Sequence, residues 1–167
     1  MRIARILLSL LASATVLPML QAQQEPAGNQ QTIEANFKAY IELLRKDIKK
    51  DKVAILSELM DLTPDEASKF WPIYNAYDKE LTKLGDERLA LFRMYVDNYE
   101  SLTDKQATTI VNGLMDVQGR RTALQRRYFQ TMSQALSPKL AARFVQIEHQ
   151  LLLVLDLQIA ASLPVVD

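Results

Sequence analysis

A short motif that occurs three times along the chain marks where its long helices begin. The motif reads LTPDEASKF at residues 62–70, LTDKQATTI at 102–110 and LSPKLAARF at 136–144. Each copy leads into a long stretch in which apolar residues recur every three or four positions, which is the period of an α-helix. No stretch shows sustained alternation of apolar and polar residues, so no strand is predicted. The chain is therefore predicted to be all-α.

The first two copies contain the residues of a capping box. Thr63 and Thr103 stand just before helical stretches, where a threonine hydroxyl can accept from the third backbone N–H of the helix. Glu66 and Gln106 lie three residues later and can accept in return from the threonine's own N–H. A leucine precedes each threonine and can pack on the first turn. The predicted capping motif comprises Leu62, Thr63, Glu66, Leu102, Thr103 and Gln106.

The third copy is an incomplete version of this motif. Ser137 can cap the last helix, and Pro138 then occupies the first helical position, where the missing N–H costs nothing. Leu140 stands where the glutamate or glutamine would be, so the reciprocal bond cannot form.

The apolar periodicity predicts four helices, arranged as an elongated hairpin or bundle with long central helices. Pro72 lies past the first turn of the second helix, where we expect a kink or a restart. The charged run KKDK at 49–52 interrupts the apolar stripe of the first helix, so either one helix or two can occupy that stretch. The predicted helices are Thr32–Met60, Pro64–Tyr99, Asp104–Ala135 and Pro138–Ala160.

The length of the second helix favours an elongated molecule. A helix over 64–99 would be about 54 Å long, whereas a compact domain of this size is only about 40 Å across. Either the helix bends, with Gly85 as the candidate hinge, or the molecule is thin and covers its apolar surface poorly. We therefore expect a homodimer mate or a client protein to cover the excess. The apolar residues outside the main stripes are Trp71, Leu89, Val96, Val111, Met115 and Phe129.

The first 22 residues have the layout of a secretory signal peptide. A basic start is followed by an apolar run at 6–20 and by a polar stretch, with cleavage expected after Ala22. An uncleaved membrane anchor is the alternative, but a run of 15 residues that contains Pro18 is shorter than the roughly 20 that a spanning helix needs. We therefore expect export to the periplasm, with no membrane span after cleavage. The mature chain would comprise a linker at 23–31, one domain at 32–163 and a tail at 164–167.

Composition excludes several classes of function. The chain has no cysteine, so packing alone must stabilise it. Without Arg2 and Arg5, 18 of the 20 basic side chains remain, against 20 acidic ones, and this balance argues against a nucleic-acid binder. His149 is the single histidine and no glycine-rich phosphate loop occurs. We therefore predict no enzyme activity, no metal and no cofactor.

Two arginines fall within the apolar stripes of the central helices. Arg88 lies in the stripe of the second helix and Arg121 in that of the third. Their stems can pack while their heads reach water. Alternatively, they form a polar layer with acids of neighbouring helices, such as Glu148, which would fix the helix register.

The third helix also carries a cluster of basic and aromatic residues. Basic groups beside apolar ones can attract acidic unfolded chains and then hold their apolar side chains. The alternative is an ordinary solvated helix face, because arginine is a good helix former. The candidate client or partner surface comprises Arg120, Arg121, Arg126, Arg127, Tyr128 and Phe129.

The repeated motif resembles the LTXXQ-motif family of exported helical proteins, which includes Spy and CpxP. LTDKQ at 102–106 matches the motif, and LTPDE at 62–66 matches with glutamate in place of glutamine. The stretches at 62–81 and 141–166 also resemble a group of uncharacterised exported bacterial proteins. The resemblance implies an elongated helical hairpin that dimerises into a cradle, with chaperone or envelope-stress functions that need no ATP. The balanced charge of this chain departs from that pattern.

These observations favour a non-catalytic protein-binding function. The first hypothesis is reversible capture of unfolded envelope proteins, or sensing of envelope stress, on a partly apolar helical surface. The alternative is a structural or regulatory protein that binds one defined partner, or its own copy, through a spare apolar helix face.

Overall fold

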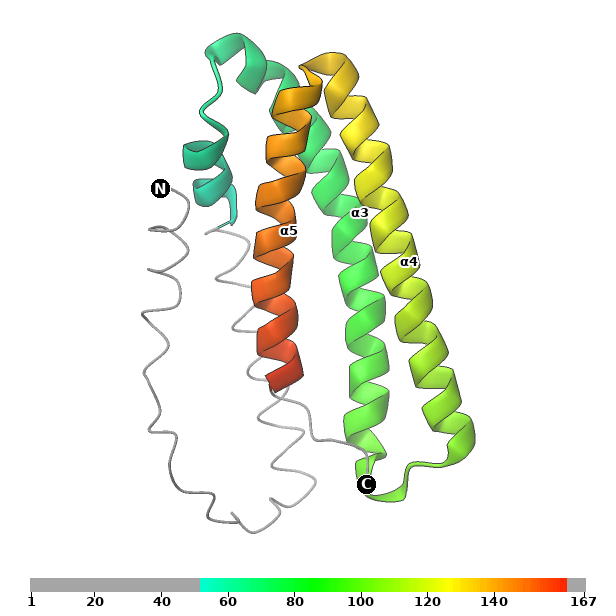
Figure 1. Cartoon of the computed structure of the whole chain (residues 1–167). Helices are drawn as coiled ribbons and strands as arrows, with labels where there is room; N and C mark the ends of the chain where they lie inside the picture. The colour runs from blue at the N-terminus through cyan, green and yellow to red at the C-terminus, as the bar shows by residue number, and fades with distance from the viewer. Residues whose placement is uncertain (1–51, 162–167) are drawn as a thin grey trace, which may run out of the picture.

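The computed structural model describes residues 52–161, and every regular element in this range is helical (Figure 1). A short helical segment at 52–60 comes first. The predicted all-α class is confirmed. The elements that follow are α3 (Pro64–Asp97), the 3-10 turn η1 (Tyr99–Ser101), α4 (Asp104–Ala135) and α5 (Pro138–Ala161).

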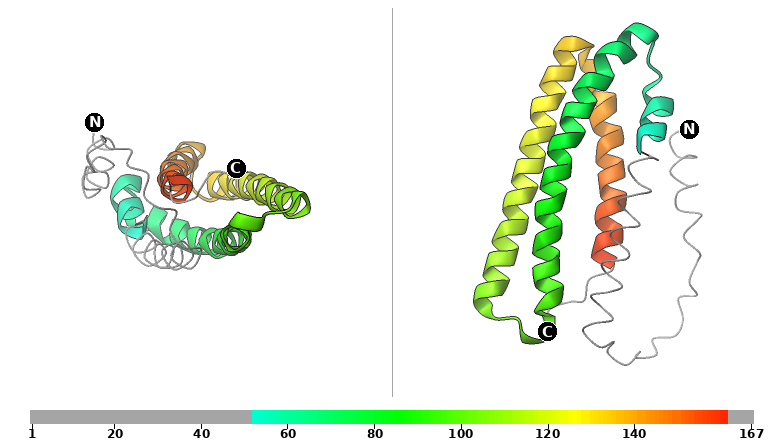
Figure 2. Two further views of the ribbon diagram at one scale, coloured as in Figure 1. Left: turned by 90° about the horizontal axis from the view of Figure 1, so that it is seen from below. Right: turned by 180° about the vertical axis from the view of Figure 1, so that it is seen from behind.

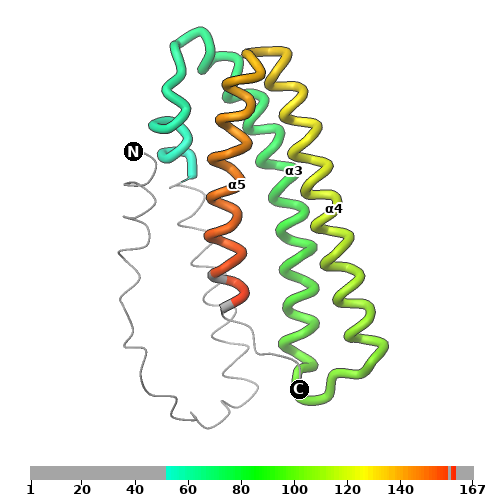
Figure 3. Tube along the Cα trace, in the orientation of Figure 1, coloured from blue at the N-terminus to red at the C-terminus, as the bar shows by residue number. Residues whose placement is uncertain are grey.

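The three long helices run antiparallel to their sequence neighbours. α3 and α4 form a hairpin that turns through η1, and α5 turns back after only Leu136 and Ser137 (Figure 3). Viewed along the helices, α5 lies beside both α3 and α4, and the 52–60 segment lies at the outer edge of the group (Figure 2). With 34 residues, α3 is about 51 Å long. The described part of the chain is therefore elongated, as the sequence predicts.

Both predicted capping boxes are present. The Thr63 N–H donates to Glu66 Oε2 (2.9 Å) and the Glu66 N–H donates back to Thr63 Oγ1 (3.3 Å). Thr103 and Gln106 repeat this pair of bonds at 3.0 and 3.3 Å. At the third copy of the motif, the Leu140 N–H donates to Ser137 Oγ (3.2 Å) without a reciprocal bond. These bonds satisfy backbone N–H groups that have no partner within the helix.

Asn98 ends α3 two residues before the predicted boundary. Its Nδ2 donates to the Met94 carbonyl (2.8 Å), and its Oδ1 accepts from Gln106 Nε2 (2.9 Å). The same glutamine that caps α4 therefore also holds the end of α3.

α4 begins and ends where the sequence predicts, and α5 ends one residue later than predicted. Most of the predicted first helix, at 32–51, lies outside the described residues, as do the signal peptide, the linker and the tail.

Of the two outcomes expected at Pro72, the restart was wrong, because α3 is a single helix that runs through Pro72 and Gly85. Proline removes the N–H that would bond to the Ser68 carbonyl. Both Pro72 and Ser68 are exposed, so water can solvate that carbonyl. Next to the proline, Phe70 is fully buried and Trp71 is half-buried.

The main core is an aromatic cluster between α3 and α5. The rings of Phe70, Tyr74 and Tyr77 all lie against Phe144, with centroids 5.3–6.2 Å apart and near-perpendicular planes. Such edge-to-face contacts add to the gain from burying apolar area. Leu56 and Met60 of the 52–60 segment are buried in the same cluster. This core ties the 52–60 segment to α3 and α5 at the end where α5 begins.

A second, smaller core lies near the α3–α4 turn. Its buried members are Leu89, Phe92, Tyr95, Val96, Ile110 and Ile159. Leu89 and Val96 were expected to lie outside the main apolar stripes and to need a partner to cover them. Both are buried within the chain, so this expectation was wrong for these two residues. The two helices of the hairpin also pack closely at Gly113 of α4, where a Cβ would lie 2.8 Å from Leu91 Cδ2 of α3. Glycine therefore allows the two helices to approach closely here.

Some of the other apolar residues outside the main stripes remain exposed. Trp71 and Phe129 pack partly against the aromatic core. Val111 and Met115 are 48% and 68% exposed and lie one turn apart on α4. On α5, Leu153 and Leu157 show the same spacing, at 52% and 67% exposure. The described helices therefore carry two short exposed apolar ridges.

Removing the second helix cap tests the role of the repeated motif. Thr103→Ala should lower the free energy of unfolding by about 1 kcal/mol, because it deletes the hydroxyl that accepts from Gln106. Thr103→Ser keeps that hydroxyl and should cost much less. Urea denaturation of both variants measures the difference. Equal losses would contradict a capping role for this side chain.

Candidate functional site: an interhelical cavity flanked by ion pairs

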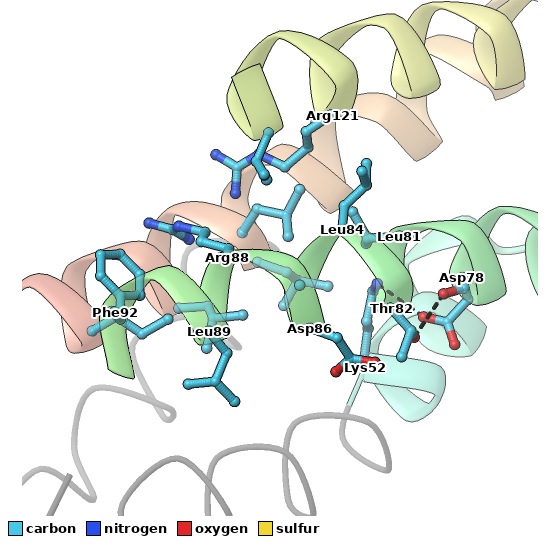
Figure 4. A pocket seen from close by; sticks show the side chains of 16 residues that line it. Lys52, Asp78, Leu81, Thr82, Leu84, Asp86, Arg88, Leu89, Phe92 and Arg121 are labelled. Carbon is cyan, nitrogen blue, oxygen red and sulfur yellow. Dashed lines mark hydrogen bonds and ion pairs between the residues drawn. The ribbon is translucent and has the colours of Figure 1, made fainter. Parts of the chain in front are cut away.

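A cavity of about 390 Å³ lies between the three long helices (Figure 4). Its apolar wall includes Leu84 and Phe92 of α3, Val117 of α4, and Leu152 and Leu155 of α5. Charged side chains stand at two places on this wall: Arg88 and Arg121 at one, and Lys52, Asp78 and Asp86 at the other. The cavity lies between the two cores, where the helix faces are only partly filled.

Arg88 and Arg121 share one carboxylate, that of Asp156 on α5. Arg121 donates through Nη2 to Oδ2 (2.7 Å) and through Nη1 to Oδ1 (3.1 Å). Arg88 Nη1 also donates to Oδ1, and its guanidinium lies 5.1 Å from the centre of the Phe92 ring. The side chains of Arg88, Arg121 and Asp156 are 24%, 15% and 22% exposed, respectively. The cluster joins α3, α4 and α5.

The two guanidiniums determine the protonation of Asp156. Burial alone would raise the pKa of this carboxyl, but the hydrogen bonds from Arg121 and Arg88 outweigh burial and lower the pKa. Asp156 therefore stays ionised at neutral pH. Of the two alternatives for the arginines, the polar layer fits the geometry. The acid in this polar layer is Asp156, so the expectation of Glu148 was wrong.

Glu148 instead belongs to a separate buried network. Lys52 Nζ lies 2.8 Å from Glu148 Oε1 and 3.4 Å from Asp78 Oδ1, and Tyr77 Oη donates to Glu148 Oε1 (3.2 Å). The Glu148 side chain is fully buried, and its Oε2 has no hydrogen-bond partner among the described residues. Burial raises the pKa of this carboxyl, and the attraction of Lys52 only partly opposes the rise.

Two features fix the end of the 52–60 segment, and they also keep Lys52 close to Glu148. Arg143 of α5 donates through Nη1 to the Met60 carbonyl (2.7 Å), which satisfies one of the free carbonyls at a helix end. Asp61 then takes a left-handed backbone conformation with φ 48°, which aspartate tolerates better than most residues. The chain can therefore turn into α3 while Lys52 stays close to Glu148.

The candidate client surface on α4 is largely engaged in contacts with α3. Arg120 pairs with Glu87, and Arg127 pairs with Glu80. Tyr128 Oη donates to Glu80 Oε1 (2.7 Å). These contacts link the two helices of the hairpin along their exposed edge.

The other members of that candidate surface lie apart from one another. Arg121 faces the cavity, Phe129 packs partly on the aromatic core, and Arg126 is exposed. The structure therefore does not bring the six residues together as one free basic and aromatic patch.

Sequence reasoning missed two members of the buried networks. Asp156 is the only charged residue within the apolar run at 150–161, and an isolated acid in such a run is a signal that could have identified it. Lys52 was seen only as the end of a charged run. Its burial depends on the chain turn at Asp61, which the local pattern does not reveal.

The described residues contain neither a metal-ligating cluster nor a membrane-spanning helix. No group of three or more metal-ligating side chains occurs between 52 and 161, and none of the helices in that range is long and apolar enough to cross a membrane. His149 is exposed on α5.

Replacing Lys52 tests the energy of the buried network. Lys52→Met should lower the free energy of unfolding by about 3 kcal/mol, because it leaves the Glu148 carboxylate buried without a cation. The double variant Lys52→Met/Glu148→Gln removes both charges and keeps an acceptor for Tyr77, so it should recover most of that loss. Denaturant unfolding measures all three proteins. A double variant no more stable than Lys52→Met would contradict this.

The raised pKa of Glu148 predicts a pH dependence of stability. Between the usual value of 4.5 and the raised value, the folded protein keeps a proton that the unfolded chain releases. The free energy of unfolding should therefore fall as the pH rises through this window, by at most about 1.4 kcal/mol per pH unit. Glu148→Gln should remove this contribution, as measured by urea unfolding between pH 4.5 and 8. The exposed control Glu58→Gln should keep the wild-type slope, and an unchanged slope in Glu148→Gln would refute the assignment.

Compared with protein-family models, with curated proteins and with solved structures, the chain matches none of them. The resemblance to the LTXXQ-motif family therefore stays a prediction that rests on the capping motif.

Proposed function

We propose that this chain is an exported, non-catalytic protein that captures unfolded proteins through exposed apolar ridges on its long helices. The observation that carries the proposal is the exposed pair Val111 and Met115 on α4, at 48% and 68% exposure. Side chains one turn apart on a helix present a continuous apolar strip to a partner. Met94 of α3 is a further exposed apolar side chain, at 38%.

The ridges replace the basic cluster as the proposed capture surface. Arg120 and Arg127 are paired with acids of α3, so their charge is locally neutralised. Attraction by net charge is weak in a chain with balanced acidic and basic side chains. Capture would therefore depend on apolar contact, which methionine favours because its flexible side chain adapts to different partners.

The alternative is binding of one defined partner or of a second copy. The ridge formed by Leu153 and Leu157 on α5 supports it, because two leucines one turn apart suit a fixed helix–helix contact. Export to the periplasm, which both proposals assume, rests on the predicted signal peptide.

An aggregation assay with matched variants tests the proposal. The wild-type protein should suppress light scattering by two unrelated unfolding proteins at near-stoichiometric amounts. Val111→Lys/Met115→Lys should lose most of this activity, because it places two charges on the ridge. Raising the salt concentration should not weaken the wild-type activity, since apolar contact is not screened.

The control adds the same charge elsewhere on α4. Asn112→Lys/Gln118→Lys changes two exposed polar residues and should keep the wild-type activity. Equal loss in both double variants would assign the effect to charge and not to the ridge. If the wild type suppresses neither protein, and sedimentation shows a dimer that the ridge variant breaks, the self-binding alternative replaces capture.

A further inference from the structure

The cavity between α3, α4 and α5 has the size and the wall of a ligand site. The volume of about 390 Å³ lies within the range of roughly 300–1,000 Å³ that is usual for small-molecule pockets. Pockets of this kind often lie between the helices of bundles and combine apolar walls with a few polar groups.

The cavity extends along α3. Its lining on α3 runs from Asp78 to Phe92, which is about 21 Å of helix at 1.5 Å per residue. Between these ends the lining is rich in leucine, with Leu81 and Leu84 on α3 facing Leu152 on α5. A wall of this kind suits a linear hydrocarbon chain.

The charges on the wall favour one negative head group. Arg88 and Arg121 carry two positive charges, and Asp156 supplies one negative charge between them, which leaves a local excess of one. The bonds to Asp156 use Nη1 of Arg88 and both terminal nitrogens of Arg121. A guanidinium has five N–H donors, so Arg88 keeps donors for a further acceptor. At the other place on the wall, Lys52 pairs with two acids, Asp78 and Glu148, and Asp86 adds a further negative charge. This part of the wall therefore disfavours an anion, and the head group is expected at Arg88.

From this geometry we propose that the cavity binds a single-chain amphiphile with one carboxylate head, such as a medium-chain or long-chain fatty acid. The carboxylate accepts from the free donors of Arg88 beside Asp156, and the acyl chain lies along the leucine wall. Burial of the CH₂ groups of the acyl chain supplies most of the affinity, and the arginine selects the head group. This inference does not depend on the capture function, because the cavity and the exposed ridges use different residues.

Isothermal titration of the whole exported chain with laurate, below its micellar concentration, tests the proposal. We expect one laurate per chain with a micromolar dissociation constant. 1-Dodecanol and dodecyltrimethylammonium should bind at least 10-fold more weakly, since they lack the anionic head. Dodecyl phosphate brings up to two charges to a site with an excess of one, and should also bind more weakly than laurate.

Two variants locate the ligand. Arg88→Gln should weaken laurate binding at least 10-fold and dodecanol binding much less, because it removes the charged donor while Arg121 keeps both of its bonds to Asp156. Gly85 lines the cavity, and a Cβ there meets no heavy atom within 4 Å, so Gly85→Leu has room to fill part of the cavity and should also weaken laurate at least 10-fold.

The matched control is Gly119→Leu on α4. Gly119 is likewise an exposed helical glycine with no heavy atom within 4 Å of an added Cβ, but it does not line the cavity. Both glycine replacements should keep the fold and raise the melting temperature, because leucine forms helix better than glycine. Gly119→Leu should bind laurate like the wild type.

Three results would overturn the proposal. If the wild-type chain binds no laurate, the cavity is not a fatty-acid site. Equal binding of laurate and dodecanol would deny the role of Arg88. Laurate binding that survives Gly85→Leu would place the ligand elsewhere on the protein.

Discussion

The carboxylate of Asp156 is the contact on which the arrangement of the three long helices depends. It receives Arg88 from α3 and Arg121 from α4 while lying on α5, so one acid fixes the register of all three helices. Apolar contacts alone specify register weakly, since leucines can exchange neighbours along a helix face at little cost. A shared ion pair cannot slide by one turn without leaving a charge unpaired in a poorly solvated place.

The sequence predicted the helices well because the signals that define them are local. The capping pairs at Thr63 and Thr103 lie within one turn of chain, and the starts and ends of α4 follow from them directly. The end of α3 was misplaced because Asn98 is held by Gln106, a contact across the turn. The restart expected at Pro72 does not occur, and its cost depends on whether the freed carbonyl faces water or the core.

The candidate site was predictable only in part. Arg88 and Arg121 could be singled out from the sequence because a charged side chain within an apolar stripe is costly to bury unless it is paired. Their partner could not be chosen from the sequence, because Glu148 and Asp156 lie about two helical turns apart on the same helix and the choice depends on the relative heights of α3 and α5. Likewise, the basic cluster on α4 was predicted to be either a client surface or a solvated helix face, whereas Glu80 and Glu87 of α3 pair with two of its arginines. Ion pairs between helices depend on the tertiary structure, so the local sequence does not reveal them.

The division of the interior into two cores has a consequence for how the protein opens. The aromatic core around Phe144 and the smaller core around Phe92 are separated by the cavity and its charged wall, so few apolar contacts connect them. Proteins open locally in cooperative units, and the least packed unit opens first. The hairpin tip beyond Leu89 should therefore act as such a unit, with backbone amides that exchange with solvent faster than those around Phe144 while the rest of the chain stays folded.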